Sequence, residues 1–387
     1  MSEIVRHINK LQASVGRPTT PQQTDRKTGI KNVTLRPKRT DKILMAKSLN
    51  NNLKKARAVK NDEFYTELSD IEKELRHYKE HFNGKTVFCN CDDPRVSNFF
   101  HYFSYNFEAL GLKKLITTCY KNQNRDLFTQ LKSESAIYLE YNGDKNGDKI
   151  PNPEEIGIIE LDGDGDFRSA ESIELLKQAD IVVTNPPFSL FREYVTQLID
   201  FEKKFLIIGS QNSISYKEIF NHIKANKIWL GYNAVKRFTM PENQEHNSII
   251  IENGKRYAVF GNICWYTNLD ISKRHDDLIL YKNFNEADYI KYDNYDAIEV
   301  SRITDIPMDY AGAMGVPITL LDKYNPNQFE ILGITDRDNN SGIKTKTYTN
   351  DDVSNPGDLN RRGVLKIGSD YKSTYARLLI KNKKVQK

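Results

Sequence analysis

One segment near the middle of the chain combines a short apolar strand with a rigid polar corner. Ile181–Val183 is apolar and β-branched, which predicts a buried strand. Asn185 follows, and then Pro186 and Pro187 prevent the strand from continuing, because proline lacks a backbone N–H and has a fixed φ. The corner therefore presents an amide side chain, a proline carbonyl and the ring of Phe188.

These groups suit a planar amine attached to an aromatic ring. Such an amine is a poor nucleophile because its lone pair is delocalised. If the Asn185 oxygen and the Pro186 carbonyl accept its two hydrogens, the nitrogen can become pyramidal and attack an electrophile held nearby, with proximity supplying much of the rate. Phe188 could then stack on a base taken out of its duplex. An isolated Asn-Pro-Pro is an ordinary turn in most proteins, so the corner gains meaning from the elements around it.

Strands and helices alternate along this part of the chain. Strands are predicted at 86–91, 115–120, 156–161, 181–184 and 204–208, and helices at about 64–81, after Pro94 with Asp93 as the N-cap, at 172–178 and at 190–201. The polar region 121–152 is interpreted as an excursion or a hairpin. Alternation of this kind predicts a parallel sheet with helices on both faces, and such sheets bind ligands at the carboxyl ends of their strands.

The charge of the chain is distributed unevenly. Residues 1–60 contain 15 Lys and Arg against 3 Asp and Glu, a balance of +12, whereas the whole chain has a net charge of +5. We predict a basic, flexible arm over 1–46, which could gain affinity for nucleic acid by displacing counterions from phosphates or could simply be a solubilising tail. A change in pattern near residue 230 predicts a catalytic domain over 47–231 and a further region over 232–387.

Composition excludes several classes of protein. No apolar run is long enough to span a membrane, and four cysteines in 387 residues do not resemble a disulfide framework, so we expect a reducing cytosol. Cys89 and Cys91 are too close together for an ordinary zinc site, and we expect no metal. The glycine-rich dinucleotide fingerprint is absent, so NAD binding is not expected.

Two acidic turns follow predicted strands. Asp92 could bind an ammonium group, although an ordinary helix cap is the better explanation of the Asp92-Asp93-Pro94 turn on its own. The turn at 162–167 begins like a calcium loop but has Phe167 where glycine is required, so calcium is not expected. Asp166 could instead accept a hydrogen bond from an adenine amino group while Phe167 stacks on its ring, or the turn could be a solvated loop.

Long stretches of the chain resemble the EcoRI-type adenine-specific DNA methyltransferases, from about residue 47 to the end. The resemblance is carried by the segments 61–66, 90–100, 163–169, 180–194, 227–231, 305–307, 314–318 and 379–383. It implies an α/β, Rossmann-like S-adenosylmethionine-dependent methyltransferase sheet with helices on both faces and a C-terminal target-recognition region. It also implies methyl transfer to the exocyclic N6 amine of a flipped adenine in double-stranded DNA, at a restriction-type, GAATTC-like site.

The resemblance carries over residue by residue. It assigns catalysis to Asn185, Pro186, Pro187 and Phe188, and cofactor binding to Tyr65, Thr66, Asn90, Asp92, Pro94, Asp166 and Phe167. Two departures concern the cofactor. The loop after the first strand lacks the usual glycines, and no acidic residue follows the second strand, where a ribose-binding carboxylate is common in the wider superfamily.

Basic and aromatic side chains after residue 231 form the candidate surface for reading the target. We predict DNA contacts from Lys236, Arg237, Phe238, Arg256 and Arg274, although each basic residue could be an ordinary surface charge. The expected partner is duplex DNA, bound by a cytoplasmic monomer of prokaryotic or phage origin with a possible cognate endonuclease. Two alternatives stay open: an RNA or protein glutamine acceptor, and a DNA-binding protein without activity.

Overall fold

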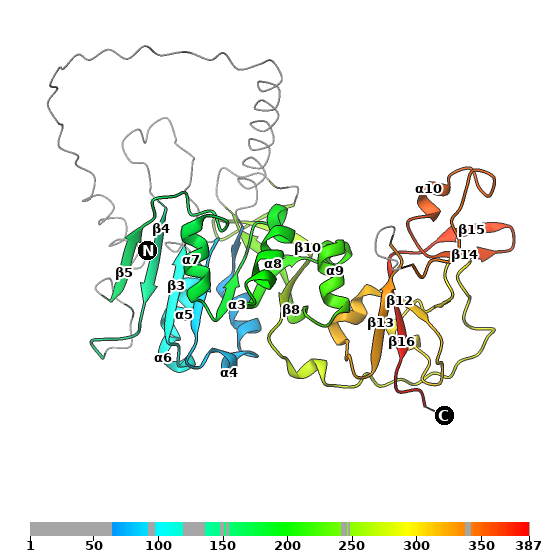
Figure 1. The fold of residues 1–387 in the computed structure, drawn as a ribbon, viewed down its shortest axis with the longest axis horizontal. Helices are drawn as coiled ribbons and strands as arrows, with labels where there is room; N and C mark the ends of the chain where they lie inside the picture. The colour runs from blue at the N-terminus through cyan, green and yellow to red at the C-terminus, as the bar shows by residue number, and fades with distance from the viewer. Residues whose placement is uncertain are drawn as a thin grey trace, which may run out of the picture.

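The computed structural model describes residues 64–91, 97–118, 136–147, 151, 155–240, 246, 248–336 and 342–386. A ten-stranded sheet holds the order β1-β8-β10-β7-β6-β2-β3-β4-β5, with β9 paired to β10 off this path (Figure 1). Its strands are β1 (Tyr65–Thr66), β2 (Thr86–Cys89), β3 (Lys114–Thr118), β4 (Ile137–Tyr141), β5 (Ile156–Glu160), β6 (Ile181–Thr184), β7 (Lys204–Ser210), β8 (Trp229–Thr239), β9 (Ile249–Glu252) and β10 (Lys255–Thr267).

The centre of this sheet is parallel, as the alternation predicts. β3 pairs with β2, β2 with β6, and β6 with β7, all in parallel. Every residue of β2 and β6 is buried, which explains their continuous apolar character. The short helices α4 (Lys79–Phe82) and α6 (Phe107–Leu110) precede β2 and β3 and lie at the bottom of Figure 1, so the carboxyl ends of these strands form the upper edge, here called the carboxyl edge.

Both flanks of the sheet are antiparallel, whereas the sequence indicates an antiparallel pairing only in the hairpin interpretation of 121–152. β4 pairs antiparallel with β3 and with β5, and β10 pairs antiparallel with β7 and with β8. The prediction of parallel neighbours for the strand at 156–161 is therefore wrong. The region interpreted as an excursion or a hairpin contains β4, which runs back along β3 as in a hairpin and leaves β5 at the outer edge of the sheet.

Helices cover both faces, and this prediction is confirmed. One core contains buried side chains of α7 (Ala170–Gln178), α8 (Phe191–Asp200) and α9 (Lys217–Lys224). The other contains side chains of α3 (Leu68–Leu75), α4, α5 (Asn98–Tyr105) and α6. No described helix is long and apolar enough to cross a bilayer.

One local prediction near the amino-terminal end of the described chain is wrong, and another falls outside the described residues. The predicted helix at 64–81 begins only at Leu68, because Tyr65 and Thr66 form β1 and pair with the end of β8. The predicted cap Asp93 and Pro94 lie outside the described residues. The described helix α5 is capped by Ser97, whose hydroxyl accepts from the N–H groups of Phe99 and Phe100.

A second, smaller sheet follows the main one. It holds the order β11-β12-β16-β13, and a separate hairpin pairs β14 with β15. The bounds are β11 (Ile298–Glu299), β12 (Met314–Pro317), β13 (Phe329–Ile334), β14 (Val364–Ile367), β15 (Asp370–Ser373) and β16 (Arg377–Asn382), with α10 (Pro356–Leu359) before β14. Its apolar side chains join the core on the α7–α9 face of the main sheet. The predicted boundary at residue 231 falls inside β8, a strand of the main sheet.

Candidate active site

The Asn-Pro-Pro-Phe corner lies at the carboxyl edge, directly after β6. β6 lies between β2 and β7, so the corner is in the centre of the sheet. Asn185 is 7% exposed, and a short 3-10 helix, η1 (Phe188–Leu190), leads from the corner into α8. The two prolines thus end the strand as predicted and hold Asn185 at the mouth of the sheet.

The amide of Asn185 is fixed on one side and open on the other. Its Nδ2 donates a 2.6 Å hydrogen bond to the backbone carbonyl of Phe64, just before β1. That contact sets the orientation of the amide, since a carbonyl oxygen needs a donor opposite it. Its Oδ1 is buried and has no hydrogen-bond partner among the described residues. A buried amide oxygen without a partner is costly, which marks it as an acceptor for a ligand.

Asn90 accepts hydrogen bonds from residues on both sides of the corner. Its backbone carbonyl accepts a hydrogen bond from the Thr184 hydroxyl, and its side-chain Oδ1 accepts one from the Tyr194 hydroxyl. Burial raises the pKa of Tyr194 well above its usual range, so this hydroxyl stays a neutral donor. Asn90 therefore ties the ends of β2 and β6 to α8. Because the Tyr194 hydroxyl already donates to Asn90 Oδ1, this side-chain oxygen stabilises the carboxyl edge.

Aromatic rings surround Phe188. The ring of Phe64 lies 6.2 Å from that of Phe188 and nearly parallel to it, at 22°. Phe238 and Phe260, from β8 and β10, lie 6.1 and 5.9 Å from Phe188, both close to edge-on. His246 lies 4.6 Å from the Phe260 ring. We call these five residues the aromatic cluster. Phe64, Phe260 and His246 carried no signal of this role in the sequence, because their contacts depend on β1, β8 and β10 meeting near the corner that follows β6.

Further buried oxygens along the carboxyl edge have no hydrogen-bond partner in the described part of the chain. They are the hydroxyls of Thr66 at the end of β1 and of Thr117 and Thr118 at the end of β3. Thr66 is held in place because its backbone carbonyl accepts a 2.7 Å bond from Asn98. Together with Asn185 Oδ1, these hydroxyls offer open hydrogen-bonding capacity to a polar ligand. Tyr65 adjoins Thr66 in β1, whereas Asp92 and Pro94 lie outside the described residues.

The side chains of the acidic turn after β5 contact other protein groups, whereas the sequence suggests that they are available to a ligand. Arg168 pairs with Asp166 at 2.7 Å and with Glu193 at 2.9 Å. Burial raises the pKa of Asp166, but the hydrogen bonds and charge of Arg168 outweigh it and hold that pKa below its usual value. Phe167 is buried, with its ring edge-on to Tyr194 at 5.0 Å. Asp166 and Phe167 thus lie beside α8, engaged with protein groups.

The predicted DNA contacts separate into three groups. Lys236 is exposed and Arg256 is half-buried, both near the carboxyl edge. Arg237 is exposed but pairs with Glu252 at 2.8 Å and lies over the Tyr257 ring at 4.8 Å. Phe238 is fully buried in the aromatic cluster, so it is not a surface contact for DNA in this structure.

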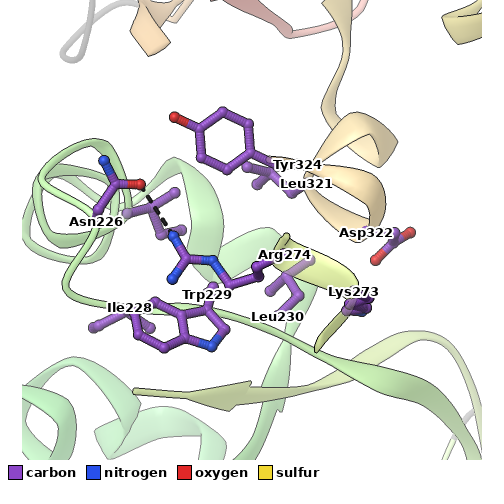
Figure 2. A pocket seen from close by; sticks show the side chains of 10 residues that line it. Asn226, Ile228, Trp229, Leu230, Lys273, Arg274, Leu321, Asp322 and Tyr324 are labelled. Atoms are coloured by element: carbon purple, nitrogen blue, oxygen red, sulfur yellow. Dashed lines mark hydrogen bonds between the residues drawn. The ribbon is translucent and has the colours of Figure 1, made fainter. Parts of the chain in front are cut away.

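Arg274 is also placed differently from its prediction. Its guanidinium lies 3.7 Å from the centroid of the Trp229 ring and donates to Asn226 Oδ1 at 3.2 Å, in a pocket between α9, β8 and the 3-10 helix Ile318–Lys323 (Figure 2). Trp229 begins β8, at the end of the sheet opposite the carboxyl edge. Arg274 is 8% exposed. Burial on an aromatic face, away from the corner, gives it a structural role.

The parallel centre of the sheet, its antiparallel flank and the open amide acceptor define a Rossmann-like methyltransferase. A family model described as "Adenine-specific methyltransferase EcoRI" matches residues 52–383, and the chain belongs to this family. It is a site-specific DNA methyltransferase that modifies adenine. The resemblance seen in the sequence is thereby confirmed. Neither an RNA or protein glutamine acceptor nor a DNA-binding protein without activity is favoured.

Curated relatives support this assignment. The chain is 49% identical over 352 residues to the Type II methyltransferase M.EcoRI of Escherichia coli, covering 89% of this chain and all of that protein. It is 42% identical to M.MgeORF184P of Mycoplasma genitalium and 37% identical to M.MpnI of Mycoplasma pneumoniae, in each case over 72% of this chain and 84% of the relative. No solved structure matches the chain.

Proposed function

We propose that the chain transfers a methyl group from S-adenosylmethionine to N6 of an adenine flipped out of duplex DNA, with Asn185 Oδ1 as the acceptor that aligns the amine. The observation that carries this proposal is the buried Oδ1 without a partner, on an amide whose other end is fixed by the Phe64 carbonyl. An adenine amino group supplies the missing donor. The Pro186 carbonyl takes the second hydrogen.

The chemistry follows from this alignment. When both N6 hydrogens are bound by acceptors outside the plane of the ring, the lone pair of nitrogen is drawn out of conjugation and can point at the methyl donor. The gain comes from positioning and from fixed dipoles, which need no rearrangement during the reaction. Phe188 supplies an aromatic face for the flipped base, beside the other rings of the aromatic cluster.

The carboxyl edge fits a polar donor molecule. S-adenosylmethionine, when bound, supplies a methyl group on a positively charged sulfur. We assign its binding to the ends of β1 to β3 and the turn after β5. The supporting observations are the partner-free hydroxyls of Thr66, Thr117 and Thr118. β3 ends at Thr118, shortly before the place where the wider superfamily often has a ribose-binding carboxylate, and we assign the ribose to the Thr118 hydroxyl. The assigned residues also include Tyr65, Asn90, Asp92, Pro94, Asp166 and Phe167.

Partner and organisation form the rest of the proposal. We infer that the chain acts as a monomer on a GAATTC-like site, one strand at a time, in the cytoplasm of a prokaryotic or phage-infected cell. A cognate endonuclease could read the same site without a stable complex. The basic segment 1–46 adds affinity for phosphates, and the catalytic unit extends through β10, since β8 and β10 complete the main sheet.

The test is to map methylated adenines. The protein is incubated with S-adenosylmethionine and DNA of varied sequence, and modified adenines are located by sequencing. We expect methylated adenines at one short DNA sequence. Asn185→Ala should show no methylation and should keep the melting temperature of the wild type. Calorimetric titration of S-adenosylmethionine into Thr118→Val and Thr66→Val gives a readout independent of turnover, with weaker binding expected for both. Full methylation by Asn185→Ala would refute the mechanism.

A further inference from the structure

The β9–β10 hairpin rises above the carboxyl edge. β8 pairs with β10 along one side. On the other side, β7 pairs with residues 263–267 of β10 and β9 pairs with residues 255–258. β9 therefore continues the line of β7 beyond the carboxyl edge, next to the corner that follows β6. Asn253 and Gly254 have φ of 50° and 74° and close the hairpin with the tight turn typical of an Asn-Gly pair.

The hairpin has two distinct faces. Arg237 bonds Glu252 and lies over Tyr257, so these side chains share one face, here called the outer face. Ile250 lies directly opposite Tyr257 in the ladder and belongs to the same face. The contacts of Arg237 confirm the alternation that the register implies.

The other face continues the aromatic cluster. Phe238 and Ala258 are paired and fully buried, and Phe238 contacts Phe188 of the catalytic corner. Ile249 lies opposite Ala258, and Ile251 lies two residues further on, so both project from this face, which we call the catalytic face. The apolar surface thus runs from Phe188 outward along β9.

The outer end of this surface is exposed. Ile249, Ile250 and Ile251 are 36%, 46% and 69% exposed, and the described part of the chain holds no other run of three exposed large apolar residues. β9 is moreover an edge strand, where exposed apolar side chains invite association. A partner that covers them at this place must approach the catalytic corner. The charges fit DNA, since Arg256 lies opposite Ile251 and Lys236 lies two residues before Phe238 in β8.

We propose that the catalytic face of the β9–β10 hairpin is a wedge, with Ile251 at its tip and Ile249 behind it, that enters the duplex beside the target adenine and holds the base stack open. The proposal rests on adenine methylation at the corner. Extrusion of a base removes its stacking contacts, and an inserted apolar side chain replaces part of them, as in proteins that kink DNA. Lys236 and Arg256 bind the flanking phosphates.

The test separates opening of the duplex from methyl transfer. Single-turnover methylation rates are measured for the wild type, Ile251→Ala and Ile250→Ala on duplexes that carry the mapped site, with the target adenine paired with thymine or opposite an abasic position. We expect Ile251→Ala to be slowed about ten- to a hundredfold on the paired duplex, the range that corresponds to burial of one isoleucine side chain. On the unpaired target it should match the wild type.

Controls make each outcome decisive. Ile250 lies on the outer face, so the rate of Ile250→Ala should stay within about twofold of the wild-type rate on both substrates. A twofold change corresponds to less free energy than one hydrogen bond contributes. Ile251→Leu should restore the rate, and 2-aminopurine at the target position should show reduced extrusion only with Ile251→Ala. Equal loss with Ile250→Ala and Ile251→Ala, or equal loss on paired and unpaired targets, would overturn the wedge. Absence of methylation by the wild type on every DNA would instead count against the proposed function.

Discussion

Asn185 and Glu74 are both buried polar side chains that bind the segment before β2 to the main sheet, yet their hydrogen bonding is opposite. Glu74, in α3, is fully buried and accepts four hydrogen bonds. They come from the Tyr78 hydroxyl at 2.8 Å, the N–H groups of Tyr232 and Asn233 at 2.7 and 2.8 Å, and the Asn233 side chain at 2.9 Å. Within the residues that the structure describes, Asn185 donates one hydrogen bond and its oxygen accepts none.

The difference separates a structural group from a functional one. A buried carboxylate is stable only when donors replace its water, and Glu74 has two for each oxygen. It therefore fixes α3 against β8 and leaves nothing for a ligand. An open acceptor such as Asn185 Oδ1 weakens the free protein slightly and becomes satisfied when substrate binds. The predictions below test this contrast.

The largest effect is expected at Asn185. Asn185→Ala should slow methyl transfer by about a thousandfold, the scale of a lost group that acts on the transition state. Asn185→Asp keeps an acceptor oxygen but loses the bond to the Phe64 carbonyl, so its loss should be on the order of tenfold. Single-turnover rates measure both. Equal losses would show that the open oxygen is not the important feature.

The next effect is expected at Glu74, and it concerns stability. Glu74→Ala should lower the free energy of unfolding by about 3 kcal/mol, because it leaves several buried donors without an acceptor. Glu72→Ala, at an exposed position of the same helix, is the matched control and should change it by less than about 0.5 kcal/mol. Urea unfolding measures both, and similar losses would contradict the role of Glu74.

A smaller effect tests how closely β8 approaches Glu74. A methyl group at Gly231 would lie 2.2 Å from Glu74 Oε1 and 2.6 Å from Trp265 Cβ, whereas one at Gly261 would meet nothing within 4 Å. Gly231→Ala should therefore cost about 1–3 kcal/mol of stability, and Gly261→Ala should be nearly neutral. The melting temperatures of the two variants test this prediction. An unchanged melting temperature for Gly231→Ala would show that β8 does not pack tightly against Glu74.

Arg274 and Lys236 give opposite expectations. Arg274→Ala should lower stability by about 1–2 kcal/mol through the loss of its contact with Trp229, and leave the salt dependence of DNA binding unchanged. Lys236→Ala should leave stability unchanged and reduce the slope of log affinity against log salt by about one. Fluorescence anisotropy at several salt concentrations measures the slope. A changed slope for Arg274→Ala would return this residue to the DNA interface.

The smallest effect concerns the turn after β5. The pKa of Asp166 is held below its usual value, so its pairing stabilises the protein above the pKa of the unfolded chain, near 4, and the gain is lost as pH falls through the folded pKa. Because Arg168 is 41% exposed, Asp166→Asn should cost less than about 1 kcal/mol at pH 7. If Asp166 also binds the methyl donor, Asp166→Asn should weaken the binding of S-adenosylmethionine more than Arg168→Ala does.

The sequence by itself determined the local structure of the site. β-branched residues followed by two prolines fix a strand that ends in a rigid corner, and periodic apolar residues fix β2, β3, β6, β7 and the helices α7 and α8. Long segments shared with the EcoRI family also identified the class of enzyme, which the comparisons confirm. These features depend on neighbouring residues, whose steric and hydrogen-bonding preferences act within a few positions.

Only the tertiary structure decided which side chains meet. The partner of Asn185 is 121 residues away in Phe64, and Glu74 finds Tyr232 and Asn233 across 158 and 159 residues. Phe238 and Arg274 fit a DNA surface by type, but the pairing of β8 with β1 and β10 buries the first, and Trp229 covers the second. A hydrogen bond or ring contact depends on which strands lie adjacent and in which register, and no local pattern carries that information.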